Sequence, residues 1–136
     1  AASGIRLAIE TEGSVSKRDH LLLQRPDEFE RLTTRFAPAD LGVNLNIGHL
    51  RLASAAFGFE PATMVDVIAD YIVAMELSHN DGVVDGHRPL QAGAWYWDLI
   101  TDQRFAATYK ILEFRNTAVA DVAACADLVA RSLCGF

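Results

Sequence analysis

Short apolar runs alternate with segments of helical periodicity along the whole chain. Four runs have strand character: residues 5–9, which end at Glu10, and residues 43–47, 72–77 and 109–113. The apolar/polar alternation of 43–47 predicts a half-buried strand, whereas the nearly continuous apolar run 72–77 is typical of a strand buried on both faces. The pattern therefore predicts four strands.

The segments between and after these runs have the periodicity of helices. Pro26, followed by Asp27 and Glu28, predicts a helix start, because proline fits the first helical position and acids favour the positive helix end. Further helices are expected at 50–57, from Pro61 to about residue 71, at 95–100 and at 117–133. The last of these is predicted to bury one apolar stripe, made of Val119, Val122, Ala126, Val129 and Leu133.

The order of these elements indicates the fold class. Successive strands are separated by roughly 30 to 37 residues that include a helix, which predicts a parallel α/β sheet joined by right-handed crossovers. The chain has 136 residues, of which 51% are apolar and 22% charged. These proportions exclude intrinsic disorder and fit one domain spanning residues 1–136.

Charge and hydropathy exclude some partners. The formal net charge is −6, which disfavours binding to nucleic acid. No apolar run approaches the roughly 20 residues that a membrane span needs, and the N-terminus lacks the features of a signal peptide. Because the sequence has no initiator Met and begins close to a strand-like run, we expect it to be part of a longer chain.

Cys125 and Cys134 both fall in the last predicted helix. Nine residues of helix place them on opposite faces and roughly 13 Å apart, which is too far for a disulfide. We expect both to be buried small apolar residues of a protein in the reducing cytoplasm.

Polar side chains follow the predicted strands where each one ends. They are Glu10, Asn46 with His49, Glu76 with Ser78 and His79, and Glu113, and the loop after the third strand adds Asn80, Asp81, Asp85 and His87. Ligands bind at the carboxyl ends of parallel strands, so we expect these groups to converge. Converging carboxylates repel one another unless a cation lies between them, and carboxylate with imidazole suits Mn²⁺, Mg²⁺, Co²⁺ or Zn²⁺. Taken singly, each acid could equally cap a helix or pair with an arginine.

Several segments resemble one known superfamily. Residues 43–50, VNLNIGHL, resemble its "LDIGH" strand, and residues 76–93 resemble its "HLHDNDG…D-x-H-x-P-L-G-x-G" segment. Residues 8–11 and 111–114 resemble its two glutamate-bearing strands. The chain is thus similar to the C-terminal half of the xylose-isomerase-like TIM barrels, which include sugar phosphate isomerases/epimerases and the AP-endonuclease family 2 proteins.

The resemblance implies roles for the strand-end residues. Glu10 and Glu113 match glutamates that bind metal and shuttle the substrate proton, and His49, Asp85 and His87 match further ligands. Asn46 and Glu76 stand where the superfamily has an aspartate and a histidine, so the summed ligand charge could be conserved. Substrate contacts are expected from three residues near the strand ends: His79, Arg88 and Arg115.

The implied activity is that of a divalent-metal-dependent sugar or sugar-phosphate isomerase or epimerase. A metal ion would polarise the substrate carbonyl, and Glu10 and Glu113 would move a proton through an enediolate. Two alternatives stay open: a metal-dependent dehydratase or lyase acting on a polyol or keto-sugar, and a non-catalytic half-barrel or partner subunit.

The length of the chain carries a prediction about assembly. A complete eight-stranded barrel needs about 250 residues, and this chain supplies four βα units. Two open edges make such a half unlikely to persist alone. We therefore expect a second chain, as in a homodimer, or an absent N-terminal half to complete the barrel.

Overall fold

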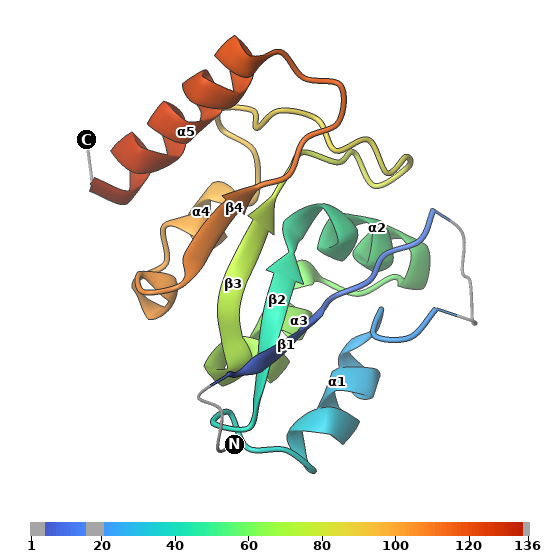
Figure 1. Ribbon diagram of the computed structural model, residues 1–136. Coiled ribbons are helices and arrows are strands. Elements are labelled where there is room, and N and C mark those ends of the chain that lie inside the picture. Colours follow the sequence, from blue (N-terminus) through green and yellow to red (C-terminus); the bar gives the residue numbers. More distant parts are fainter. Residues whose placement is uncertain (1–4, 16–20, 135–136) are drawn as a thin grey trace.

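Four parallel strands form the centre of the computed structural model, which describes residues 5–15 and 21–134 (Figure 1). The strands are β1 (Leu7–Glu10), β2 (Leu41–Asn46), β3 (Ile72–Leu77) and β4 (Tyr109–Leu112). They pair in the order β1-β2-β3-β4, and each neighbouring pair is parallel. The predicted (βα)4 arrangement is therefore confirmed, and β1 and β4 are the edge strands.

Helical segments lie between consecutive strands and after β4. They are α1 (Pro26–Thr33), α2 (Ile47–Phe57), α3 (Pro61–Ile68), the 3₁₀ turn η1 (Ala69–Tyr71), α4 (Trp97–Ile100), the 3₁₀ turn η2 (Gln103–Phe105) and α5 (Val119–Cys134). α1 begins at Pro26 as predicted.

The boundary between β2 and α2 differs from the prediction. The sequence pattern extends the strand to Ile47 and begins the helix at Leu50, whereas Ile47 is already the first residue of α2. The reason is that the side chain of Asn46 caps the helix by accepting a hydrogen bond from the backbone N–H of His49 (3.1 Å). Strand and helix therefore meet without a loop.

The two faces of the sheet differ in their environment. Leu45, Met75 and Leu77 are fully buried against the helices, with which they form the hydrophobic core. In the view of Figure 1, α3 and α4 lie behind the strands, and none of the described helices lies in front. On this open face Tyr109 is 77% exposed and Ile111 is 44% exposed.

α5 buries a different face from the one predicted. Val129 is buried, but Val119 is 85% exposed, Leu133 is 41% exposed and Ala126 is exposed. Cys125, which is not part of the predicted stripe, is buried. The helix lies beside the edge strand β4, so only a narrow face of it meets the core. The expected absence of a disulfide holds, since both cysteines are free, but Cys134 is exposed and not buried.

Among the described residues, no helix has the length and apolar character needed to cross a membrane.

Candidate active site at the carboxyl ends of the strands

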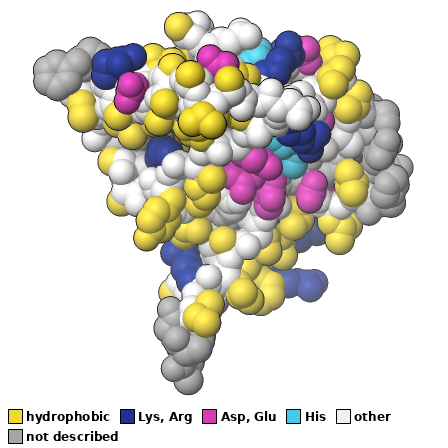
Figure 2. Space-filling model, turned by 45° about the horizontal axis from the view of Figure 1, so that its top comes forward, with side chains coloured by type: hydrophobic (Ala, Val, Ile, Leu, Met, Phe, Trp, Pro, Cys, Tyr) yellow, Lys and Arg dark blue, Asp and Glu magenta, His cyan; other side chains and the backbone are white. Residues whose placement is uncertain are grey.

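The carboxyl ends of the strands bring the predicted polar residues together. Three of them occupy the last or next-to-last position of a strand: Glu10, Asn46 and Glu76. Glu113 directly follows β4. His49 lies in the first turn of α2, and the loop after β3 adds Asp85 and His87. Figure 2 views the molecule with this end turned forward, and acidic side chains gather there beside a histidine. We call these seven residues the strand-end cluster.

Asn46 lies at the centre of the cluster. Its side-chain nitrogen Nδ2 is 3.0 Å from one carboxylate oxygen of each of three glutamates: Glu10, Glu76 and Glu113. Asn46 is fully buried. The predicted convergence of the three glutamates is thus what the structure shows, and an amide group occupies the point where they meet.

Two imidazoles flank Asp85 on one side of this centre. Nε2 of His87 lies 3.0 Å from Oδ1 of Asp85, and Nε2 of His49 lies 3.9 Å from the same atom. The two rings are nearly perpendicular, with centroids 5.8 Å apart. One ligand atom from each of the three residues fits within a 4.8 Å span, so His49, Asp85 and His87 form a group that could hold a metal ion.

The other nitrogen of each imidazole faces a different partner. Nδ1 of His49 lies 3.0 Å from the carbonyl oxygen of Thr11 and 3.2 Å from Oε1 of Glu10. A carbonyl oxygen only accepts, so Nδ1 carries the proton and Nε2 keeps its lone pair for a ligand role. Nδ1 of His87, which makes no hydrogen bond with the described residues, lies 3.1 Å from Oε2 of Glu113.

The backbone holds His87 in an uncommon conformation. Its φ is +43°, in the left-handed region that non-glycine residues rarely adopt, and the residue is only 2% exposed. Such conformations cost on the order of 1–3 kcal/mol and concentrate at functional sites, where the surroundings enforce them.

Asn80 and Gly48 support the loop that carries Asp85. Nδ2 of Asn80 donates to Oδ1 of Asp85 (3.3 Å), and Oδ1 of Asn80 accepts from the backbone N–H of Gly86 (2.7 Å). A Cβ on Gly48 would lie 2.7 Å from both Nδ2 of Asn80 and Oγ of Ser78. Glycine at position 48 therefore allows α2 to approach this loop closely.

The cluster perturbs two of its carboxyl groups in opposite directions. Burial raises the pKa of Glu10, and the charge of Glu76 adds to that effect against the lowering influence of Asn46 and His49. Burial also acts to raise the pKa of Asp85, but the hydrogen bond from Asn80, the two imidazoles and Arg115 outweigh it and lower that pKa. Burial and neighbouring groups thus shift the pKa values of these two acids in opposite directions.

The three predicted substrate-contacting residues are not all in the cluster. Arg115 joins it, because its guanidinium contacts the carboxylate of Asp85 at 3.3 Å. Arg88 instead forms an ion pair with Asp81 at 2.5 Å. His79 lies against Tyr96, with Nδ1 3.5 Å from the tyrosine oxygen, and burial together with Arg88 lowers the pKa of His79.

Two further residues take part that the sequence did not single out. Oγ1 of Thr11 accepts a hydrogen bond from the backbone N–H of Asn46 (3.0 Å), and Nδ2 of Asn44 donates to Oε1 of Glu76 (2.7 Å). Asn80, one of the polar residues expected in the loop after the third strand, takes part through Asp85. The alternation of β2 offers a signal for Asn44, since residues two apart share one face of a strand.

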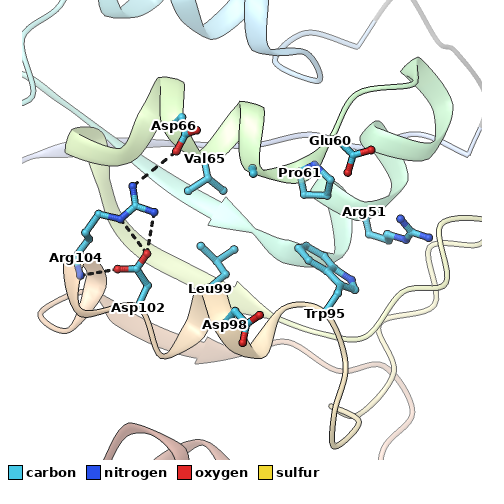
Figure 3. Close-up of a pocket in the computed structure, with 11 residues that line it drawn as sticks. Arg51, Glu60, Pro61, Val65, Asp66, Trp95, Asp98, Leu99, Asp102 and Arg104 are labelled. Carbon is cyan, nitrogen blue, oxygen red and sulfur yellow. Dashed lines mark hydrogen bonds and ion pairs between the residues drawn. The ribbon is translucent and has the colours of Figure 1, made fainter.

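A second polar region lies on the helical side of the sheet. It is a pocket of about 430 Å³ between α3 and α4, which contains none of the strand-end cluster. Val65 and Leu99 face each other at its floor, while Arg104 pairs with Asp66 and Asp102 at one end (Figure 3). Trp95 is 37% exposed at its rim.

Two solved structures share the fold. A D-tagatose 3-epimerase-like protein has a TM-score of 0.73 and 16% sequence identity, and a protein described as a candidate xylose isomerase from Rhodospirillum rubrum has a TM-score of 0.63 and 18% identity. Each similarity covers 96% of this chain and 47% of the other. No protein-family model and no curated protein matches the sequence.

These similarities define the class of fold. The chain has the (βα)4 fold of half a TIM barrel, and it spans about half the length of the structures that it matches. The two structures that share this fold are an epimerase-like and a xylose-isomerase-like protein, which is the kind of fold that the sequence resemblance predicts.

Proposed function

We propose that this chain contributes the catalytic end of a divalent-metal-dependent isomerase or epimerase that acts on a sugar or sugar phosphate. The observation that carries the proposal is the convergence of Glu10 and Glu113 on one point, each 3.0 Å from the same atom of Asn46, beside a group of metal-ligand type. Two proton-transfer groups on either side of one centre are what such a reaction requires. The fold likeness to sugar isomerase and epimerase structures supports the substrate class.

His49, Asp85 and His87 fit a divalent ion. Two imidazoles and one carboxylate suit Zn²⁺, Mn²⁺ or Co²⁺ better than Mg²⁺, which prefers oxygen ligands. The Nδ1 proton of His49 is held by a carbonyl oxygen, as is usual for metal-bound histidines. When bound, the ion would polarise the carbonyl group of the substrate and make the neighbouring C–H more acidic.

The glutamates provide the acid and the base. The raised pKa of Glu10 makes its carboxylate easier to protonate, which suits a group that takes up a proton and returns it. Glu113 is half-exposed and can reach a substrate, so we assign it the removal of the proton. Arg115, exposed next to Asp85, is placed to hold a hydroxyl or phosphate group of the substrate. Arg88 and His79 stay proposed contacts for a distant part of the substrate.

The test is proton exchange in heavy water. Glu113→Gln keeps the shape of the side chain but removes the base, and we expect it to slow the incorporation of deuterium next to the substrate carbonyl by about 10²–10⁴-fold. Asp98→Asn, in the pocket between α3 and α4, is the matched control and should leave the rate unchanged. Keto-sugars and their phosphates, with Mn²⁺ added, are the substrates to use, and NMR is the measurement.

The outcomes separate this reaction from its alternatives. Undiminished exchange in Glu113→Gln contradicts the assignment of the base. Loss of water from the substrate, detected as a mass decrease in the product, would identify a dehydratase. A protein that binds no divalent ion and exchanges no proton on any of these compounds would be the non-catalytic half-barrel.

We also propose that a second (βα)4 unit covers the open face of the sheet, supplied by a second copy of this chain or by a separate half. Tyr109 and Ile111 are exposed there, and both edge strands are unpaired among the described residues. Native mass spectrometry should give a multiple of the 14.9 kDa chain mass. Ile111→Asp should lower that mass to the single chain, whereas Val83→Asp, at an exposed loop position, should not. A folded wild-type monomer would contradict pairing between copies.

The domain extent and the cellular location are proposed on the same basis. We take residues 1–136 as one domain, because the described elements form one continuous sheet. The two free cysteines fit the reducing environment of the cytoplasm.

A further inference from the structure

The orientation of the Asn46 side chain is determined by the first turn of α2. Oδ1 accepts a hydrogen bond from the backbone N–H of His49 (3.1 Å), which places Nδ2 on the side of the glutamates. Turning the amide round would put Oδ1 against three carboxylate oxygens and Nδ2 against a backbone N–H. Both contacts would then be repulsive, so the helix cap and the glutamates select the same orientation.

This orientation presents a donor where a metal ligand would have to present a lone pair. An amide nitrogen has no lone pair available for a cation, and the oxygen of Asn46 is already used by the helix. An aspartate at the same position would have a second oxygen to offer. The three glutamates and Asn46 therefore do not fit a divalent ion, although their charges alone would attract one.

The amide replaces part of the charge compensation that an ion would give. Its two hydrogens cannot serve all three carboxylates, and each glutamate has a further partner. Nδ1 of His49 lies 3.2 Å from Glu10, and Nδ1 of His87 lies 3.1 Å from Glu113. Asn44 donates to Glu76. The amide, Asn44 and the two imidazoles thus surround the three glutamates.

We propose that Asn46 takes the place of a cation among the three glutamates, so that the chain holds one divalent ion, at His49, Asp85 and His87. The location of that one ion rests on the proposed function, whereas the exclusion of a second ion rests on the contacts of Asn46. Asn46 is accordingly a specificity-determining residue: it sets how many ions the strand-end cluster accepts.

The experiment counts ions. The full chain is saturated with Mn²⁺, and bound metal is measured per chain by native mass spectrometry and elemental analysis. We expect one ion in the wild type and two in Asn46→Asp, because the new carboxylate can cap α2 with one oxygen and face the glutamates with the other. Asn44→Asp adds the same charge on the same strand but keeps the amide of Asn46, and it should still bind one ion.

His87→Ala identifies the site of the first ion. It should remove the ion from the wild-type background and leave one in the Asn46→Asp background. If the wild type binds no ion but Asn46→Asp binds one, the exclusion by Asn46 is supported and the proposed His-Asp-His ion is wrong.

Three results overturn the inference: two ions in the wild type, no gain in Asn46→Asp, or the same gain in Asn44→Asp. The wild-type count needs no variant, so two ions there would be decisive even if Asn46→Asp failed to fold. Circular dichroism of each variant checks folding.

Discussion

The strand-end cluster and the pocket between α3 and α4 contain similar side chains in different arrangements. Both combine several carboxylates with arginine, and each contains a side chain that caps a helical turn: Asn46 caps α2, and Asp102 caps η2. In the cluster the three glutamates come from the ends of β1, β3 and β4 and meet around one buried amide at the end of β2. In the pocket they lie on helical segments, where Asp66 and Asp102 pair with one exposed arginine.

The comparison shows how the backbone determines whether charges converge. Parallel strands end at a common edge, so side chains at equivalent positions are held close together whatever their charge. Acids on a helix surface can turn toward water, and their mutual repulsion is screened there. Equal substitutions should therefore have unequal effects in the two regions.

Asn46→Ala should have the largest effect on stability. It removes the cap of α2, which contributes about 1 kcal/mol, and takes from three partly buried carboxylates a donor that they share. Hydrogen bonds to charged groups contribute about 1.5–3 kcal/mol. We expect the free energy of unfolding to fall by about 2–4 kcal/mol, measured by urea unfolding in the presence of a chelator. A loss of less than 1 kcal/mol would mean that the amide does not hold the glutamates together.

Gly48→Ala should have the next largest effect. The added Cβ would lie 2.7 Å from Asn80 and Ser78, and overpacking of this kind typically costs about 1–3 kcal/mol. Because Asn80 positions Asp85, ion affinity should fall together with stability. Isothermal titration with Mn²⁺ measures the ion affinity. Gly93→Ala is the control without overpacking, because a Cβ there would meet nothing within 4 Å, and it reports the backbone cost of replacing a glycine at a surface turn. An unchanged affinity in Gly48→Ala would separate Asn80 from the ion site.

Asp102→Ala tests the cap in the other region. Its carboxylate accepts from the backbone N–H of Arg104 (2.9 Å), but it does so at the protein surface. We expect a smaller decrease in melting temperature than in Asn46→Ala and no change in the number of bound ions. Equal decreases for the two variants would remove the distinction between the regions.

Asp66→Asn should have the smallest effect. The pair with Arg104 spans 3.7 Å between two exposed side chains, and such pairs contribute little to stability. Melting temperatures of wild type and variant should coincide at both low and high salt. A clear loss confined to low salt would show that the pocket, like the cluster, depends on its charges.

The sequence predicts the strands well because their apolar runs are short and sharply bounded. It places Glu10, Glu76 and Glu113 at the correct ends of their strands, and from that their convergence follows. It misplaces the start of α2, because Ile47 continues the alternation of the strand while the cap at Asn46 begins a helix. Local periodicity cannot resolve a junction that one side chain determines.

Tertiary contacts account for the other differences. The stripe on α5 has correct helical spacing, but which face meets the core depends on where the helix lies relative to β4. The partners of Arg88 and His79 also depend on tertiary structure: Arg88 pairs with Asp81, and His79 lies against Tyr96. The central role of the Asn46 amide depends on side-chain orientation, which no spacing rule contains.

The unlike edges of the sheet have a consequence for how copies could associate. β4 of one copy can only extend a parallel sheet by meeting β1 of the next, so the contact is head-to-tail and does not use the same surface twice. Such a contact forms a closed ring when the rotation between units divides a full turn, and a growing filament when it does not. Four strands are half of an eight-stranded barrel, so each unit of such a ring would span about half a turn, and two units would close it.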